Sequence, residues 1–404
     1  MRIIADLHVH SRFSYACSRE METERLAWWA KRKGITLLGT GDFTHPIYLT
    51  SLKQKLEPAE EGLFRLRVGE REVRFLLTVE ITNIFRHAGR LRKTHTLVFA
   101  PSFTVVDRLN ARFAAHGNLA IDGRPTLTCS AHDLLKIVLD TAPECEVVPA
   151  HVWTPWFSVL GSLSGFDSLA ECYGDDTRYI HAVETGLSSD PAMNWRLSAL
   201  DKIALMSNSD AHSPRKLARE ANVLECELSY TGVLDALMSH DPQRFLYTIE
   251  FFPEEGKYHL DGHRQCKVRL SPAETQRLQN QCPVCGKKLT VGVLHRVEAL
   301  ADRAPGYQPA GAIPARHLLP LEEIIAAAFG QKPNTKKVNT EYERLLARYG
   351  SELAILLEIE EAELAEDTPP RILSGILEVR RGEVRITPGY DGVYGEVRLF
   401  GERE

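Results

Sequence analysis

No hydrophobic run in this sequence approaches the roughly 20 residues that a membrane-spanning helix requires. The first residues also lack the basic segment followed by an apolar segment that marks a secretory signal peptide. Both features argue against a membrane or secreted protein, and we expect a cytoplasmic location.

An excess of positive charge is missing as well, because 49 Lys and Arg residues face 54 Asp and Glu residues and the formal charge is −5. This excludes a uniformly basic nucleic-acid-binding protein, although a basic patch beside a metal site could still bind a phosphodiester. The 404 residues, 44% of them hydrophobic and 25% charged, have ordinary globular composition. A chain of this length predicts one large domain and at least one smaller one.

Cysteine is sparse, and most of it is scattered. Five of the eight cysteines stand alone in the sequence, as reduced intracellular thiols usually do. These are Cys17, Cys129, Cys145, Cys172 and Cys226. The other three belong to a cluster of possible metal ligands.

The N-terminal part of the chain alternates apolar strand-like runs with helical patterns. "RIIADLHVH" predicts a buried strand, "METERLAWWAKRKG" a helix that ends at Gly34, and "ITLLGTGD" a second strand. This rhythm predicts parallel pairing in an α/β fold. It recurs in "VRFLLTVEI", "HTLVFAP", "ECEVVPAH", "IHAVETG" and "KIALMSNSDAH".

Eight histidines and acids fall at or just beyond the carboxyl ends of these runs, where a parallel barrel collects its active site. They are His8, His10, Asp42, Glu80, His151, Glu184, Asp210 and His212. His95 instead begins its strand, and it reaches the same rim if its segment pairs in antiparallel fashion with the one that ends at Glu80. Imidazoles and carboxylates are ligands of zinc, manganese and iron, so the set predicts a metal site. Capping of strand ends explains any one of these residues but not all of them in this order.

A second set of possible ligands lies near residue 270. His263 and Cys266 are separated by two residues, as are Cys282 and Cys285, and fifteen residues lie between the pairs. This spacing is close to a zinc ribbon in which histidine replaces one cysteine. His259 is the alternative fourth ligand.

Basic residues lie close in sequence to both sets of possible metal ligands, the one at the strand ends and the one that contains the cysteines. Arg86, Arg90, Arg92 and Lys93 occupy the loop expected between Glu80 and His95, and Arg264 and Arg296 flank the cysteines. Near a phosphoryl site such side chains would bind a DNA backbone, although a solvated charged loop is the simpler interpretation.

Three domains are predicted from these changes in character. Residues 1–255 would form the metal-binding barrel, 256–300 a zinc module, and 301–404 a mainly helical region that ends in short strands. The tail contains a long helical pattern, "VNTEYERLLARYGSELAILLEIEEAELAE", and an alternating segment near its end.

The motifs "DLHVH", "GTGD", "TVEIT", "HTLVF", "PAHV" and "SNSDAH", in this order, resemble those of the PHP superfamily of phosphoesterases. The resemblance implies a distorted seven-stranded β/α barrel with a two- or three-metal site. By that resemblance Glu80 bridges two metals. One would be held by His8, His10, Glu80 and Asp210, and the other by Glu80, His95 and His151.

Asp42 and His212 would belong to a third metal site, where this sequence departs from the family. Phe43 stands where a histidine often follows the acid. Either His45 supplies the missing imidazole or the third site is weaker. Glu184 is an additional ligand or a structural residue.

The barrel motifs are followed by the cysteine cluster, "PLEEIIAAAFG" and "PGYDGVYG". In this order they resemble the endonuclease Q family over essentially the whole chain. This resemblance implies a metal-dependent endodeoxyribonuclease that nicks DNA on the 5′ side of uracil, hypoxanthine, xanthine or abasic sites. It implies catalytic roles for Glu80, Asp210 and His212, a structural Zn²⁺, and Zn²⁺, Mn²⁺ or Mg²⁺ in the barrel. Damaged DNA would be the partner, near the nucleoid, with repair proteins acting downstream. The alternatives are a histidinol-phosphate phosphatase and a non-catalytic DNA-binding protein.

Overall fold

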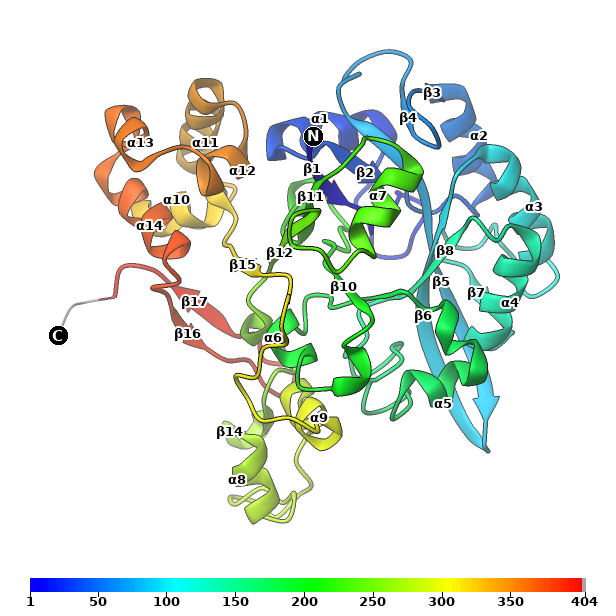
Figure 1. The fold of residues 1–404 in the computed structure, drawn as a ribbon. Coiled ribbons are helices and arrows are strands. Elements are labelled where there is room, and N and C mark those ends of the chain that lie inside the picture. Colours follow the sequence, from blue (N-terminus) through cyan, green and yellow to red (C-terminus); the bar gives the residue numbers. More distant parts are fainter. Residues whose placement is uncertain (402–404) are drawn as a thin grey trace.

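The protein is described by a computed structural model that covers residues 1–401. A mixed α/β body occupies one side of the molecule, a helical C-terminal region the other, and a small cysteine-containing module lies below them (Figure 1). No helix within the described residues has the length and apolar character that a bilayer crossing needs.

The core of the α/β body is an eleven-stranded sheet. β1 (Arg2–Asp6) pairs in parallel with β2 (Leu37–Gly39), which pairs in parallel with β5 (Arg74–His87). β6 (Arg90–Ala100) is antiparallel to β5, and β8 (Glu146–Pro149) is antiparallel to β6, so β8 runs in the same direction as β1. The predicted parallel direction is confirmed for β1, β2 and β5.

β9 (Ala182–Glu184) and β10 (Ala204–Met206) form a separate parallel pair. The segment after β10 returns to the segment after β1, where Val9 and Ala211 form an isolated parallel bridge. A closed barrel of seven strands therefore stays a prediction, and the observed architecture is a mixed α/β fold.

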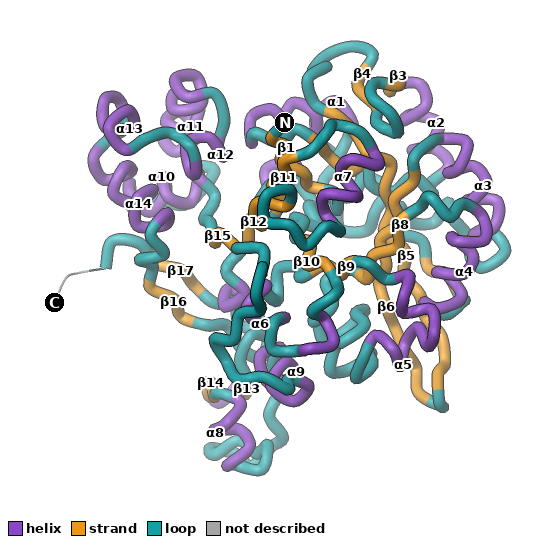
Figure 2. Tube along the Cα trace, viewed as in Figure 1, coloured by secondary structure: helices purple, strands orange, loops and turns teal. Residues whose placement is uncertain are grey.

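Further strands and helices complete this body (Figure 2). The additional strands are β3 (Leu56–Pro58), β4 (Phe64–Leu66), β7 (Thr126–Leu127), β11 (Ala221–Glu225), β12 (Phe245–Glu250) and β15 (Ala315–His317). The helices are α1 (Thr23–Lys33), α2 (Pro46–Lys55), α3 (Phe103–Phe113), α4 (Ala131–Thr141), α5 (Leu169–Tyr173), α6 (Pro191–Asn194) and α7 (Tyr230–Leu237). Short 3-10 helices cover Gly174–Tyr179, Ser198–Leu200, Pro214–Lys216, Pro253–Glu255 and Arg264–Cys266.

The segment expected as a loop between Glu80 and His95 is a long β-hairpin, and the loop prediction was wrong. β5 and β6 remain paired as far as His87 and Arg90. Only Ala88 and Gly89 turn, with φ of 46° and 76°, as a two-residue hairpin turn with two left-handed residues requires. The basic side chains assigned to a loop therefore lie on paired strands. The expected antiparallel pairing of the two segments is confirmed.

The long helical pattern of the tail is divided into separate helices. Gly350, with φ of 91°, ends α11 (Lys336–Tyr349), and the Ser351 hydroxyl accepts a hydrogen bond from the backbone of α12 (Glu352–Leu357). The helical region also contains α10 (Leu321–Phe329), α13 (Glu361–Asp367) and α14 (Pro370–Arg380), followed by β16 (Arg385–Thr387) and β17 (Glu396–Arg398).

A buried ion pair joins this helical region to α1. The ammonium group of Lys33 lies 2.6 Å from the carboxylate of Glu352, and both side chains are almost completely buried. Tyr342 donates a hydrogen bond of 2.7 Å to the same carboxylate. A paired and hydrogen-bonded buried charge fixes how two elements pack, since removing one partner leaves the other uncompensated.

The cysteine-containing module is built from short elements. β13 (Asp261–His263) and β14 (Val268–Leu270) form an antiparallel pair, followed by α8 (Pro272–Arg277) and α9 (Val293–Leu300). The turn between β16 and β17 packs on it, because Asp391 accepts hydrogen bonds from the backbone of Arg264 and the hydroxyl of Thr290. The end of the chain is thereby tied to this module.

Candidate metal centre

His8 and His10 follow β1 and are buried. Nδ1 of His8 lies 3.0 Å from the Glu184 carboxylate, which leaves Nε2 as the ring nitrogen available to a metal. Nε2 has no hydrogen-bond partner within the described chain, and it lies 3.6 Å from both Glu80 and Asp210. A buried, unpartnered imidazole nitrogen aimed at two carboxylates is the arrangement that a divalent cation would complete.

Glu80 is shared between two groups of side chains. Its Oε1 lies 2.7 Å from Nδ1 of His95 and 3.0 Å from Nε2 of His151. Its Oε2 lies 3.3 Å from Nε2 of His10. One carboxylate oxygen thus faces each group, which is the geometry of a bridging ligand.

The potential ligand atoms of each group lie within 4.8 Å of one another. The groups are His8, His10, Glu80 and Asp210, and Glu80, His95 and His151, the same sets that the PHP resemblance implies for two metals. The donor types and the shared carboxylate suggest divalent metal ions.

The hairpin explains how Glu80 meets His95. Thr82 is the cross-strand partner of His95, so Glu80 and His95 are diagonal neighbours on one face of the β5–β6 pair. The remaining members come from segments that follow strands. Asp42, His151 and Asp210 have positive φ values of 49°, 29° and 46°. Left-handed backbone at non-glycine residues is strained, and such strain concentrates at functional sites.

The electrostatics of the group reflect close opposite charges. Burial disfavours the charged imidazole, but the carboxylates of Glu184 and Asp210 raise the pKa of His8 well above its ordinary value. Burial likewise opposes ionisation of Asp210, and His8 and His10 nevertheless lower its pKa. His95 differs, because burial dominates and lowers its pKa to about 4. His95 is therefore a neutral nitrogen donor at pH 7, as a metal ligand must be.

Asp42 and His212, assigned to a third metal, lie beside the first group. Asp42 is 3.2 Å from Nδ1 of His10 and accepts hydrogen bonds from the backbone and hydroxyl of Ser11 and from Ser14. His212 packs against His10 with ring centroids 4.7 Å apart. Within residues 1–401 neither residue joins a group of three close ligand atoms. Asp42 holds Nδ1 of His10 as Glu184 holds Nδ1 of His8, and the third metal site stays a prediction.

Phe43 and His45 lie near the expected third metal site, and Glu184 lies beside the first ligand group. Phe43 is fully buried, and the ring of His45 stacks on Phe13 with centroids 4.3 Å apart. Glu184 accepts from His8, from the backbone N–H of His151 and from Asn208. A carboxylate occupied in this way orients other residues of the centre.

Sequence reasoning missed Arg124. Its Nη1 donates to Glu80 Oε2 across 3.1 Å. Burial opposes its charge, yet Glu80 and Asp210 raise the pKa of Arg124, so the guanidinium is charged. The only signal in the sequence is a glycine and an arginine in the turn-like stretch "IDGRP", which carries no periodicity.

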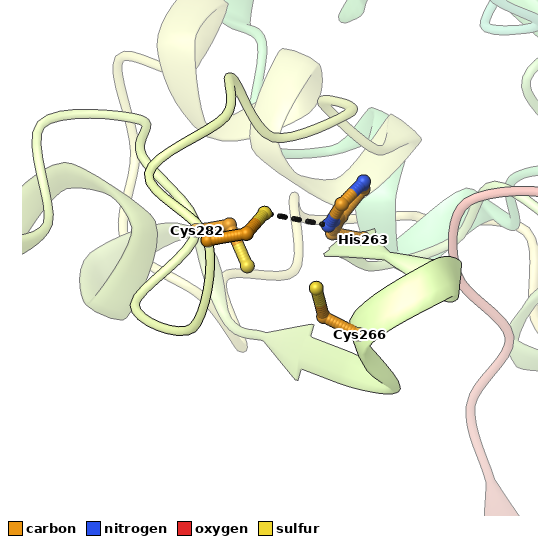
Figure 3. Close-up of side chains that lie close together, drawn as sticks. His263, Cys266 and Cys282 are labelled. Atoms are coloured by element: carbon orange, nitrogen blue, oxygen red, sulfur yellow. Dashed lines mark hydrogen bonds between the residues drawn. The ribbon is translucent and has the colours of Figure 1, made fainter.

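The four residues of the second set come together in the small module. His263, Cys266, Cys282 and Cys285 place ligand atoms within 4.8 Å of one another, and Figure 3 shows His263, Cys266 and Cys282 directed to a common point. Burial raises the pKa of the Cys282 thiol, but the backbone N–H groups of Cys285 and Val284 outweigh it and lower that pKa to about 6. A thiolate at neutral pH suits a metal ligand. His259 is outside this group, so His263 is the better fourth ligand.

The basic residues differ in exposure. Arg86, Arg90 and Arg264 are exposed, whereas Lys93 is half-buried and lies 5.1 Å from the centre of the Phe157 ring. Arg92 is buried and donates to Glu171 at 3.1 Å and to the carbonyl of Gly165. A buried guanidinium that is already paired holds the 152–165 segment and is poorly placed to contact DNA.

Arg296 also has partners inside the protein. It donates to the carbonyls of Leu160 and Phe166 and to the carboxylate of Asp167 at 2.7 Å. These contacts join the small module to the segment that follows His151.

Two solved structures are similar to this chain over nearly its full length. A lesion-specific endonuclease from Pyrococcus furiosus has a TM-score of 0.88 and 30% identity, covering 99% of this chain and 96% of that chain. A complex of endonuclease Q with a 27-mer duplex substrate that has an abasic lesion at the active site has a TM-score of 0.86 and 30% identity, covering 100% of this chain and 98% of that chain. The chain belongs to the endonuclease Q family.

Two further matches concern one archaeal protein. Residues 320–383 match the family model described as the MJ0043 C-terminal domain. The uncharacterised protein MJ0043 of Methanocaldococcus jannaschii is 33% identical over 257 residues, which are 61% of this endonuclease Q family member. The alignment spans only 31% of the MJ0043 chain.

Proposed function

We propose that the protein is a metal-dependent repair endonuclease that hydrolyses the DNA phosphodiester on the 5′ side of deaminated bases or abasic sites. The observation that carries the proposal is the pair of ligand groups that share Glu80, in a chain 30% identical to an endonuclease Q bound to lesion-containing duplex DNA. The fold proposed for residues 1–255 is the PHP barrel, with a zinc module at 256–300 and a helical region at 301–404.

The chain's own residues determine what the centre can do. His8, His10 and Asp210 would hold one ion, His95 and His151 another, and Glu80 both. When bound, Zn²⁺, Mn²⁺ or Mg²⁺ supplies Lewis-acid polarisation of the phosphodiester and activation of water. Glu184 and Asp42 hold the Nδ1 atoms of His8 and His10, so both imidazoles present Nε2 to the centre.

His212 is positioned to move a proton. Its side chain is one-third exposed, and its Nδ1 donates to the carbonyl oxygen of Asp210 across 2.9 Å. Nε2 is thereby left as the atom that would protonate the leaving 3′ oxygen. Burial lowers the pKa of His212, so a nearby phosphate is needed to favour the charged ring.

DNA contacts would come from exposed basic side chains. Arg86 and Arg90 on the hairpin, Lys93 nearer the centre and Arg264 on the zinc module are the proposed phosphate contacts. Arg92 and Arg296, also predicted from the sequence to bind DNA, would support the DNA surface indirectly, since their guanidinium groups bind acceptors inside the protein. Such contacts position a duplex without reading its sequence.

Specificity is proposed to follow from the chemistry of deamination, which replaces an exocyclic amine by a carbonyl. A pocket of hydrogen-bond donors accepts the new carbonyl of uracil or hypoxanthine. It leaves the amine of a normal base facing a donor, at a cost of roughly 1–3 kcal/mol for each unsatisfied buried group. The base must leave the stack to be inspected, and a poorly paired base does so more easily.

The test uses an end-labelled duplex that contains one deoxyuridine, deoxyinosine or abasic site, with Mn²⁺ or Mg²⁺. We expect a single nick immediately 5′ to the lesion that leaves a 3′ hydroxyl, and little cutting of the undamaged duplex. Efficient dephosphorylation of histidinol phosphate together with intact lesion DNA would instead establish the phosphatase alternative.

A further inference from the structure

Arg124 enters the metal centre from a loop. It lies between α3 and β7, and its guanidinium reaches the oxygen of Glu80 that faces His10. Its side chain is 21% exposed, so Arg124 is not completely closed off from solvent. A guanidinium has five N–H donors, and the contact with Glu80 needs one of them.

The loop that carries Arg124 is held rigidly. The backbone N–H of Gly123 donates to the carbonyl of Phe13, and the Thr44 hydroxyl donates to the carbonyl of Gly123. A Cβ atom at Gly123 would lie 2.2 Å from Oδ2 of Asp42, so only glycine permits this approach. Asp122 accepts from the backbone N–H groups of Tyr15 and Arg124. Arg124 is therefore positioned before any ligand arrives, as electrostatic catalysis requires.

Once metals are bound, Arg124 would share its strongest partners with them, because Glu80 and Asp210 belong to the ligand groups. The other carboxylates close by are those of Asp42, Glu184 and Asp122. Two divalent cations and Arg124 would together balance these five negative charges. A phosphodiester brings one negative charge, and the transition state of its hydrolysis carries more.

We propose that Arg124 is a catalytic residue that binds a non-bridging oxygen of the scissile phosphodiester and stabilises the negative charge that grows on it in the transition state. The proposal rests on the proposed nuclease function. A planar guanidinium binds phosphate oxygens through directed N–H groups, which a lysine ammonium cannot reproduce.

A merely structural role makes a different prediction. If Arg124 only compensated the buried charge of Glu80, its loss would weaken metal binding or folding. Loss of a phosphate contact would leave metal content unchanged and slow the chemical step. The two roles separate when metal content, DNA affinity and single-turnover cleavage are measured on the same preparations.

The experiment compares Arg124→Gln and Arg124→Lys with Arg112→Gln, which changes an exposed arginine in the last turn of α3. We expect Arg124→Gln to lower the single-turnover rate by about 100- to 1,000-fold, the usual effect of losing one transition-state donor. Metal content and affinity for lesion DNA should stay near wild type. Arg124→Lys should recover little of the rate, and Arg112→Gln should cleave normally.

Phosphorothioate substrates identify the oxygen. Sulfur at the oxygen that Arg124 contacts should slow the wild-type protein, and Cd²⁺ should not restore the rate. In Arg124→Gln that diastereomer should lose its penalty. Full activity in Arg124→Gln, metal loss in parallel with activity, or an unchanged sulfur penalty would overturn the proposal. A wild-type protein that cuts no lesion DNA would overturn the nuclease function itself, which is a distinct result.

Discussion

The carboxylate of Glu184 lies 3.0 Å from Nδ1 of His8, and both side chains are almost completely inaccessible to solvent. Glu184 therefore determines which nitrogen of His8 faces Glu80 and Asp210. The carboxylate of Asp42 contacts Nδ1 of His10 in the same way. Both imidazoles are thereby oriented so that Nε2 is the nitrogen available to a metal.

Glu184→Gln should weaken metal binding without emptying the site completely. The amide oxygen can still accept from His8, but the imidazole becomes less basic. We expect the affinity for Mn²⁺ or Zn²⁺ to fall by roughly 10- to 100-fold, as for other partners of metal-binding histidines. Titration of the metal-free protein by calorimetry measures this. Glu146→Gln is the matched control, since Glu146 pairs with His181 at 3.2 Å and belongs to neither ligand group.

Cys282→Ser should release one zinc ion per chain. A serine hydroxyl is a poor ligand at neutral pH, and small modules of this kind depend on the metal for folding. Elemental analysis of the purified protein gives the zinc content, and limited proteolysis reports unfolding of residues 256–300. Zinc content equal to that of the wild type would show that Cys282 is not a ligand.

The two histidines near this module offer a direct comparison. His263 lies 3.4 Å from the sulfur of Cys285, whereas His259 is outside the ligand group. His263→Ala should lose zinc and His259→Ala should keep it. The reverse pattern would assign the fourth position to His259.

The ligand groups of the α/β body could be predicted from the sequence because their geometry is local to strand ends. His8 and His10 are two residues apart after a strand, and Asp210 follows another strand candidate, so both lie at the carboxyl ends of their strands. The His263, Cys266, Cys282 and Cys285 group could be predicted equally well, because its spacing is short and repeated. A resemblance to known motifs then divided the ligands of the α/β body into two groups.

Arg124 could not be predicted in this way. It lies on a loop whose position depends on Gly123 passing against Asp42, a contact between residues far apart in the sequence. The extension of the β5–β6 pairing to His87 and Arg90 was missed for another reason. The outer half of the hairpin has basic side chains on both faces, so it lacks the alternation of a half-buried strand. Pairing continues there because the two-residue turn at Ala88 and Gly89 fixes the register.

Asp210→Asn should separate DNA binding from cleavage. The amide keeps the shape of the side chain but removes a charge and an anionic ligand close to Nε2 of His8 and His10. We expect the cleavage rate to fall on the order of 100-fold or more, as when other transition-state interactions are lost. Affinity for lesion DNA should remain, since phosphate contacts come from basic residues elsewhere. Normal nicking by Asp210→Asn at saturating Mn²⁺ would remove Asp210 from the centre.

The last prediction concerns the pH dependence of stability where the α/β body, the cysteine-containing module and the tail meet. Burial, helped by the nearby charge of Glu323, raises the pKa of Glu255 from 4.5 to about 8. Its Oε1 has no hydrogen-bond partner in the described chain, and its backbone carbonyl accepts from Gly395. Below pH 4.5 both folded and unfolded states are protonated, so the group has no effect. Between pH 4.5 and 8 the unfolded state releases its proton while the folded state keeps it, so stability falls as the pH rises.

Glu255→Gln removes this ionisation and should therefore stabilise the protein at high pH only. We expect the Tm of the variant to match the wild type near pH 4.5, to exceed it increasingly up to pH 8, and to keep a constant advantage above that. Calorimetric scans at several pH values measure the difference. Glu144→Gln changes an exposed carboxyl and should show no such trend. A Tm difference for Glu255→Gln that is the same at pH 5 and pH 9 would mean that the carboxyl of Glu255 ionises normally in the folded protein.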